Sequence, residues 1–184
     1  MLKTGFTLLI AAFYCFCNFA LYPVPASAEC TGSSPNWTSS ADYASVSACV
    51  TRATAGDTIT ISGNATWTQT VELKRGLNLI GSGNPTITTE QATGIFRLAP
   101  DATPRTKHET FAIKGFVFDG NNTYLLGGGL ITGHNPSAKD YLNVIIMNNT
   151  FRNVIPPNGH GIMFWGSFWG VIAQNTFDRI AIVI

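Results

Sequence analysis

The stretch LNVIIMNNTFRNVIPPNGHGIMFWGSFWGVIAQNTFDRI, residues 142–180, contains one motif twice. The first copy is IMNNTFR at 146–152, and the second is IAQNTFD at 172–178, 26 residues later. A third copy, IKGFVFD at 113–119, lies 33 residues before the first, and a weaker fourth, LIGSG at 79–83, lies 34 residues before the third. Repeats of this length are typical of architectures in which short units stack on one another.

Each copy has the pattern of a short alternating strand, a tight polar turn and a second short strand. The unit is too short to hold a crossover helix, and it cannot bury its apolar side alone, so we expect the copies to stack. Stacking would bring Phe118, Phe151 and Phe177 together in the interior. It would also place Asn149 above Asn175 in equivalent turns, where their amides can bridge successive units. The sequence therefore predicts an all-β solenoid.

This repeat resembles the right-handed parallel β-helix of the pectate lyase-like superfamily. In that family an asparagine ladder in the turn between two strands is a recurring feature. The resemblance covers residues 40–184 and implies a right-handed parallel β-helix fold. Many unrelated functions share this scaffold, so the fold by itself does not indicate an activity.

Residues 1–28 have the features of an export signal. Lys3 supplies the positive charge, residues 6–22 form an apolar run, PVP at 23–25 breaks it, and ASA at 26–28 is a cleavage site. The alternative, a membrane anchor, is disfavoured by the prolines and the cleavage site. We expect a secreted, cell-surface or periplasmic protein with no membrane segment after cleavage.

Cleavage changes the charge and the cysteine content of the chain. Loss of Lys3 leaves ten basic and ten acidic residues, and this zero net charge argues against nucleic acid as a partner. Cys15 and Cys17 leave with the signal, whereas Cys30 and Cys49 remain. An oxidising compartment favours a disulfide between Cys30 and Cys49 over two buried free thiols.

An N-terminal segment, residues 29–57, precedes the repeat region at 58–184. SSAD at 39–42 is a typical helix start, and apolar residues follow at helical spacing before the strand TITI at 58–61. A helix followed by such a strand resembles the N-terminal cap of many β-helix proteins. A cap of this kind covers the apolar interior and the open strand edges of the first unit.

The resemblance implies that a functional site lies in a groove on an outer sheet, framed by loops. One candidate loop, residues 121–140, carries His134, and another, residues 155–169, carries Trp165 and Trp169. Exposed aromatic side chains on a rigid scaffold are suited to stacking on sugar rings, so these three are the candidate substrate-binding residues. Phe164 and Phe168, which precede the two tryptophans, are expected to fill the interior of the solenoid.

The sequence GHG at 159–161 resembles the Gly-His-Gly motif of polygalacturonases, whose histidine assists catalysis. That family also has an Asn-Thr-Asp motif and an Asp-Asp pair upstream, and this chain has neither. Inverting hydrolysis needs two carboxyl groups about 6.5–9.5 Å apart. His160 cannot replace such a pair. The resemblance makes it a candidate catalytic residue, and a turn or loop role is the favoured alternative.

The repeat also aligns Asp119, Arg152 and Asp178 in one column. Neighbouring strands lie about 4.8 Å apart, which separates the two carboxylates by about 10 Å with a guanidinium between them. In a lyase, arginine would act as the base and the aspartates would hold calcium (Ca2+) against a uronate. The favoured alternative is a structural charge ladder, since the sequence has no dense aspartate cluster and its histidines lie far apart. No metal ligand or other cofactor is expected.

The last residues, AIVI at 181–184, have the pattern of a further strand. No polar cap follows them, so we expect an exposed solenoid end. Either the chain is the N-terminal part of a longer protein with further coils, or a partner chain covers this end.

Two functions remain open. The first is a polysaccharide-associated protein that binds or cleaves a cell-surface or plant-type polysaccharide, as a lyase or a glycoside hydrolase if it is an enzyme. The second is a non-catalytic structural or adhesive surface protein. The resemblance supports the first, and the missing catalytic pairs support the second.

Overall fold

The computed structural model describes residues 29–90, 94–100, 109–125, 128–135, 142–155 and 159–180. Within these ranges the chain forms sixteen strands and one helix, so the predicted all-β class is confirmed. The export signal and the terminal strand expected from the sequence lie outside the described residues. The described part has no helix with the length and apolarity needed to span a bilayer.

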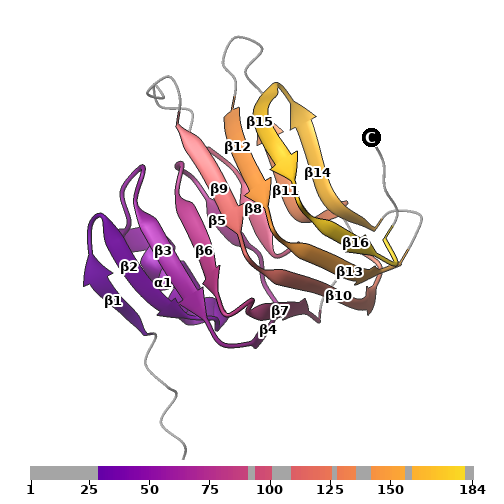
Figure 1. Cartoon of the computed structure of the whole chain (residues 1–184), viewed down its shortest axis with the longest axis horizontal. Helices are drawn as coiled ribbons and strands as arrows, with labels where there is room; N and C mark the ends of the chain where they lie inside the picture. The colour runs from indigo at the N-terminus through magenta and orange to yellow at the C-terminus, as the bar shows by residue number, and fades with distance from the viewer. Residues whose placement is uncertain are drawn as a thin grey trace, which may run out of the picture.

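The strands form three sheets, and almost all neighbouring strands are parallel (Figure 1). The seven-stranded sheet contains, in spatial order, β1 (Cys30–Ser33), β2 (Asn36–Ser40), β3 (Thr58–Ser62), β6 (Asn78–Ser82), β9 (Thr110–Lys114), β12 (Leu142–Met147) and β15 (Phe168–Ala173). The pair β1 and β2 is antiparallel, and every other pair in this sheet is parallel.

The two smaller sheets are entirely parallel. The five-stranded sheet contains β4 (Ala65–Trp67), β7 (Thr86–Thr89), β10 (Val117–Thr123), β13 (Thr150–Val154) and β16 (Thr176–Asp178). The four-stranded sheet contains β5 (Val71–Leu73), β8 (Phe96–Leu98), β11 (Gly129–Asn135) and β14 (His160–Gly166).

From β3 onward the chain visits the three sheets in a fixed rotation. It passes from the seven-stranded sheet to the five-stranded and then the four-stranded sheet before returning. Each complete pass therefore adds one parallel strand to every sheet, and the last described pass, β15 and β16, adds one to two of them. Successive passes stack side by side (Figure 1). This arrangement is compatible with a β-helix-like solenoid.

The interior follows the register that the repeat predicts. Phe118 pairs with Phe151, and Phe151 with Phe177. Their ring centroids lie 5.3 and 5.1 Å apart. Phe118 and Phe151 are fully buried, whereas Phe177 is 39% exposed. The predicted stack and its register are confirmed, but the interior position expected for Phe177 is not, because this ring is exposed at the end of the described stack.

The asparagine ladder, defined here as Asn149 and Asn175, is also confirmed. The Oδ1 atom of Asn149 accepts from the backbone N–H of Phe116 at 3.0 Å, and Nδ2 donates to the carbonyl of Ile113 at 3.0 Å. Asn175 repeats both bonds one pass later, accepting from the N–H of Asn149 at 3.0 Å and donating to the carbonyl of Ile146 at 2.7 Å. Each amide thus ties its turn to the preceding turn.

The residues before Asn149 and Asn175, and the equivalent residue of the preceding copy, Gly115, have a left-handed backbone. Gly115 has φ of 78°, and the equivalent Asn148 and Gln174 have φ of 56° and 57°. Glycine adopts this conformation without cost, and asparagine tolerates it better than most residues do. The polar, glycine-rich turns of the repeat are therefore required by the sharp corner between two sheets.

The helix α1 (Tyr43–Arg52) begins where the sequence predicts. Asp42 caps it by accepting the backbone N–H of Ser45 at 2.9 Å through Oδ1. Val46 and Val50 lie on the buried side of the helix and belong to the core at the N-terminal end of the stack.

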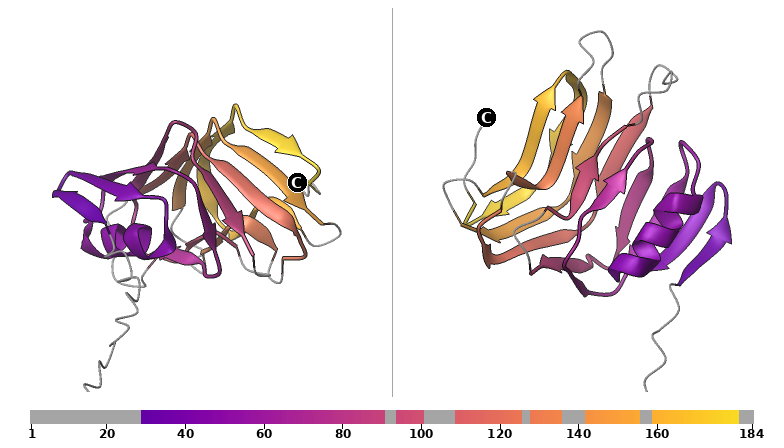
Figure 2. Two further views of the ribbon diagram at one scale, coloured as in Figure 1. Left: turned by 90° about the horizontal axis from the view of Figure 1, so that it is seen from below. Right: turned by 180° about the vertical axis from the view of Figure 1, so that it is seen from behind.

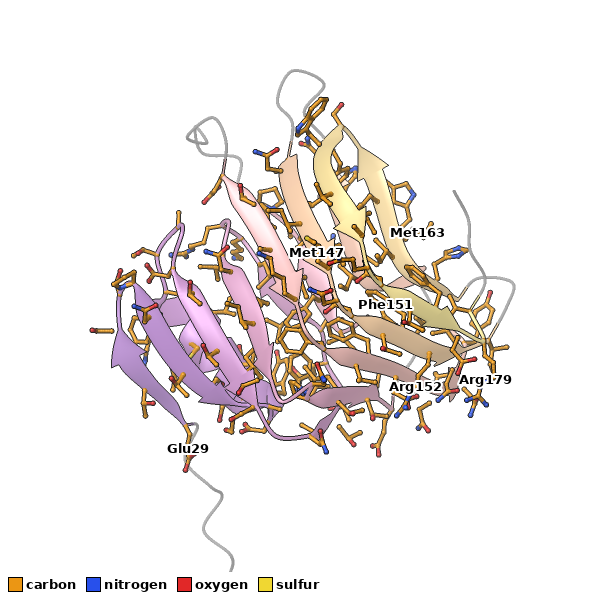
Figure 3. The ribbon with its side chains drawn as sticks, in the orientation of Figure 1. Glu29, Met147, Phe151, Arg152, Met163 and Arg179 are labelled. Carbon is orange, nitrogen blue, oxygen red and sulfur yellow. A yellow bond between two sulfur atoms is a disulfide. The ribbon has the colours of Figure 1, made fainter. Side chains whose placement is uncertain are left out.

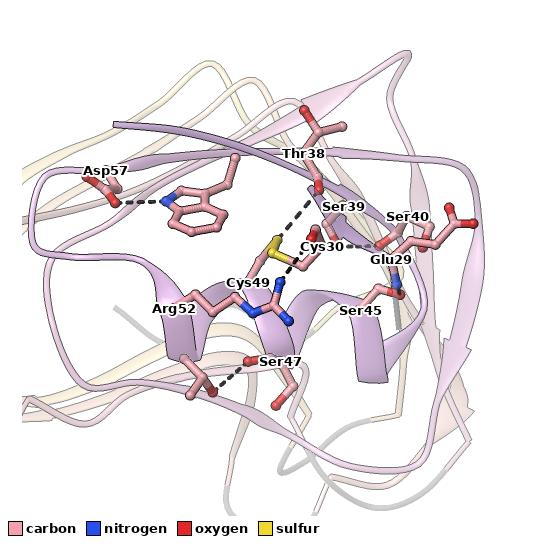
Figure 4. Close-up of a disulfide and its surroundings, with 12 residues drawn as sticks. Glu29, Cys30, Thr38, Ser39, Ser40, Ser45, Ser47, Cys49, Arg52 and Asp57 are labelled. Carbon is pink, nitrogen blue, oxygen red and sulfur yellow. Dashed lines mark hydrogen bonds between the residues drawn. A yellow bond between two sulfur atoms is a disulfide. The ribbon is translucent and has the colours of Figure 1, made fainter. Parts of the chain in front are cut away.

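A disulfide and an arginine join α1 to the first strand (Figure 4). The structure links Cys30 to Cys49, the pairing expected from the sequence. Arg52, in the last turn of the helix, donates to the carbonyl of Cys30 at 3.1 Å. These bonds fix the helix across the β1–β2 hairpin.

Asp57, just before β3, forms a second group of contacts at the N-terminal end of the stack. Its carboxylate accepts the backbone N–H of Thr54 at 2.9 Å. It also accepts the indole N–H of Trp37 at 2.8 Å, the bond drawn from Asp57 in Figure 4. Ser34 donates a further bond at 2.8 Å. The N–H of Thr54, followed by Trp37, lowers the pKa of Asp57 to about 2.

Candidate functional site

A surface groove of about 890 Å³ runs between α1 and the four-stranded sheet. Figure 2 shows, in its right-hand view, the helix lying beside this sheet on the rear of the molecule. The side chains used below line the groove along its length: Tyr43 and Thr51 from the helix, then Glu72, Arg97, Thr132 and Trp165 from the sheet.

Strand alternation aims the charged side chains into the groove. Val71 and Leu73 are buried on either side of Glu72, and Phe96 and Leu98 are buried on either side of Arg97. Successive side chains of a strand point to opposite faces, so the two charged residues face outward.

The outward residues form a line across the sheet. Glu72 pairs with Arg97, and Arg97 pairs with Thr132 on the next strand. Strands lie about 4.8 Å apart, so this line runs along the stacking direction rather than along any strand. The groove thus follows the long direction of the stack.

Glu72 and Arg97 form an ion pair of 3.5 Å in the groove. Their side chains are 45% and 53% exposed, so solvent screens the pair and its contribution to stability is small. Both side chains therefore remain open to a ligand.

The structure brings two of the three predicted substrate-binding residues together. His134 and Trp165 pair across β11 and β14, and both line the groove. Trp165 is 42% exposed, whereas Phe164 beside it packs on Phe168 with ring centroids 4.3 Å apart. Phe164 and Phe168 pack against the core but are only partly buried, so the expectation that they fill the interior holds in part.

Trp169 lies elsewhere. It is 70% exposed, but it belongs to β15 in the seven-stranded sheet, pairs with Asn143 and is not among the residues that line the groove. The two tryptophans therefore occupy different sheets of the molecule.

The predicted column of Asp119, Arg152 and Asp178 is in register on the five-stranded sheet. Arg152 donates from Nε to Oδ2 of Asp119 at 2.7 Å. Asn153 and the backbone N–H of Asn121 donate to Oδ1 of Asp119 at 3.0 and 2.8 Å. Every oxygen of this carboxylate is thus already bonded within the protein.

These bonds outweigh the effect of burial on Asp119. Burial raises the pKa of its carboxyl, whereas hydrogen bonds from Asn153, from the backbone of Asn121 and from Arg152 lower it. The balance leaves the pKa below its ordinary value of 3.8. Asp119 is therefore held as a carboxylate.

Asp178, at the far end of the column, pairs with the neighbouring Arg179 at 3.5 Å. Arg152 and Arg179 lie at the same edge of the molecule (Figure 3). The column is thus a series of paired charges, an arrangement that agrees with a charge ladder.

His160, the remaining catalytic candidate, begins β14 and is 8% exposed. A Cβ at Gly161 would lie 3.0 Å from Phe177 and 3.2 Å from Phe151, and one at Gly159 would collide with Val154. Packing thus accounts for both glycines of the Gly-His-Gly sequence. None of the four catalytic candidates is among the residues that line the groove.

The described residues contain no cluster of three or more His, Cys, Asp or Glu side chains that could hold a metal ion. Sequence reasoning missed Tyr43, Glu72, Arg97 and Thr132 as groove residues. A signal existed for the charged pair, because VEL at 71–73 and FRL at 96–98 each place one charge between two apolar residues.

Comparisons with known proteins add no assignment. A scan against protein-family models, a search of curated proteins and a search of solved structures each give no match. The functional inference therefore rests on the fold and on the groove.

Proposed function

We propose that this chain is an exported right-handed parallel β-helix protein of the pectate lyase-like type, and that it binds an extended polysaccharide in the groove. The stacked parallel sheets, the asparagine ladder and the helical cap support the fold assignment. The signal-like features of residues 1–28 support export.

The observation that carries this proposal is the half-exposed Trp165 at one end of an elongated polar groove. An indole ring offers a flat apolar face for a sugar ring, and its N–H is a hydrogen-bond donor. Along β14, Trp165 points to the side opposite Phe164, which packs on Phe168, so the indole faces the groove and not the interior.

The arrangement favours binding over cleavage in this groove. Glu72 is the one carboxylate among the described residues that line it, whereas inverting and retaining hydrolases use a pair of carboxyl groups. Asp119 and Arg152 are bonded to one another on a different sheet. We therefore propose polysaccharide association without catalysis by the predicted residues.

A structural or adhesive surface protein is the second candidate. The observation in its favour is the column of paired charges, in which Asp119, Arg152 and their asparagine partners serve the stack itself. On this view the solenoid is a rigid spacer, and the groove carries no ligand.

A polysaccharide panel separates these possibilities. The purified protein without residues 1–28 is incubated with immobilised neutral and acidic polysaccharides, with calcium and with a chelator, and the bound fraction is measured. Retention on a polysaccharide without products supports the proposal. Unsaturated, ultraviolet-absorbing products would indicate a lyase, and new reducing ends without them a hydrolase. Absence of retention on every polysaccharide would favour the structural alternative.

A further inference from the structure

We infer that the polysaccharide is an uncharged one, bound across the four strands from α1 to β14, and not a polyuronate. This inference rests on the proposed function and concerns the same groove. It follows from the charge balance, the hydroxyl groups and the placement of the aromatic rings.

The charges in the groove cancel. Arg97 carries the positive charge of a guanidinium, but Glu72 lies 3.5 Å from it and offsets that charge. Apart from the imidazole of His134 and the phenol of Tyr43, the other described residues that line the groove have side chains without an ionisable group. A polyuronate has one carboxylate on each sugar, and binding it requires a groove of net positive potential. The carboxylate of Glu72 would instead repel it.

The remaining polar groups of the groove are hydroxyls, which donate as well as accept hydrogen bonds and so match the hydroxyls of a neutral sugar. Two of them already donate to backbone carbonyls, Thr51 to Ser47 at 2.8 Å and Thr70 to Gly94 at 2.6 Å. These two therefore present acceptor lone pairs to the groove. The hydroxyl residues that line it are Tyr43, Ser47, Thr51, Thr70 and Thr132.

An aromatic ring stands near each end of the groove. Tyr43 on α1 packs edge-on against Trp67, with centroids 5.8 Å apart, and this contact holds its ring in place. Trp165 stands on β14, across three strand spacings, or about 14 Å, from the edge strand β5. A ligand that touches both rings must therefore span several sugar units, so affinity should rise with oligosaccharide length.

The test is calorimetric titration of the protein with neutral and uronic-acid oligosaccharides of matched length. The neutral set comprises cello-, xylo- and manno-oligosaccharides in a short and a long form, and the acidic set comprises oligogalacturonides. We expect a neutral oligosaccharide to bind more tightly than the oligogalacturonide. Its Kd should change by less than about twofold up to about 1 M salt, where the Debye length is about 3 Å.

The variant Glu72→Gln sharpens the test, because it leaves the charge of Arg97 unbalanced. Affinity for the oligogalacturonide at low salt should rise by about tenfold, the change expected when one screened repulsion becomes an attraction. Glu109→Gln, which makes the same charge change outside the groove, should leave both affinities unchanged. Thermal unfolding of both variants checks that they remain folded.

Tighter binding of the oligogalacturonide by the unaltered protein, with steep salt dependence, would overturn this inference and leave the proposed function standing. An equal gain in Glu72→Gln and Glu109→Gln would also overturn it, because the effect would then come from net charge and not from the groove. Failure of every oligosaccharide, neutral or acidic, to bind would overturn the proposed function together with this inference.

Discussion

The four-stranded and five-stranded sheets are built by the same passes of the chain, yet their outward charges behave differently. On the five-stranded sheet, Asp119 and Arg152 bond at 2.7 Å, with side chains 12% and 39% exposed. On the four-stranded sheet, Glu72 and Arg97 stand 3.5 Å apart, with side chains 45% and 53% exposed. Equal strand spacing thus produces a tight structural pair in one place and an open polar surface in the other.

The difference comes from what surrounds each pair. Asn153 and the backbone of Asn121 add bonds to Asp119, so its carboxylate is held from several sides. Glu72 and Arg97 face a groove with α1 on its far side. Charge at a repeated position is therefore not by itself a sign of a functional site in this fold, whereas the exposed pair beside the groove and Trp165 is the one that fits the proposed binding.

The largest effect is expected inside the five-stranded sheet. Phe151→Ala should lower the free energy of unfolding by about 3–5 kcal/mol, because it removes a fully buried ring between two others. Phe177→Ala should cost less, since that ring is 39% exposed. Urea unfolding of the two variants measures the difference. Equal losses of unfolding free energy in the two variants would show that burial does not determine how much each ring stabilises the protein.

The corner between the seven-stranded and five-stranded sheets should be the next most sensitive place. Asn149→Ala should cost about 1–3 kcal/mol, because it leaves the N–H of Phe116 and the carbonyl of Ile113 without their bonds. Glu72→Ala, in the groove, serves as the control and should stay within about 0.5 kcal/mol of the parent. Denaturant titration checks both. If Asn149→Ala unfolds like the parent, the ladder contributes nothing to stability.

The ion pair of the five-stranded sheet should have a smaller effect. Arg152→Met removes the ion pair with Asp119 and should lower the free energy of unfolding by only about 1 kcal/mol. The loss is small because solvent screens the partly exposed guanidinium. Polysaccharide retention should be unchanged, since Arg152 does not line the groove. A variant of unaltered stability that no longer retained polysaccharide would reverse the roles assigned here to the two sheets.

The last effect concerns Asp57, just before β3, and it is seen on acidification. Its pKa is lowered from 3.8 to about 2, so its stabilising contribution is complete above pH 3.8 and is lost as the pH falls toward 2. Thermal melting between about pH 5 and pH 2 should therefore show a smaller acid-induced decrease in Asp57→Asn than in the parent. Identical pH profiles of the two proteins would contradict the depressed pKa.

Much of the fold is predictable from the repeat. The offsets between copies fix the register of Phe118, Phe151 and Phe177, and the polar turns fix the place of Asn149 and Asn175. Local chemistry suffices here, because each unit can bury its apolar side only against its neighbour. The repeat also predicts the alignment of the charged column, but not which of its groups are already bonded.

The groove could not be predicted in the same way. It requires α1 to lie beside β5, a contact between elements that share no repeat. Glu72 and Arg97 lie outside the motif copies, so alignment of the copies does not indicate that they are neighbours or that they line a groove. Trp165 and Trp169 look alike in the sequence, and only the turn between β14 and β15 assigns them to different sheets.

These two tryptophans provide the most direct measurement. Trp165→Ala and Trp169→Ala remove the same side chain from two exposed positions, one in the groove and one outside it. Affinity electrophoresis against the polysaccharide retained in the panel should show a loss of about tenfold, or about 1.4 kcal/mol, for Trp165→Ala, and no change for Trp169→Ala. Unchanged binding in a folded Trp165→Ala, or an equal loss in both variants, would contradict the assignment of the ligand to the groove.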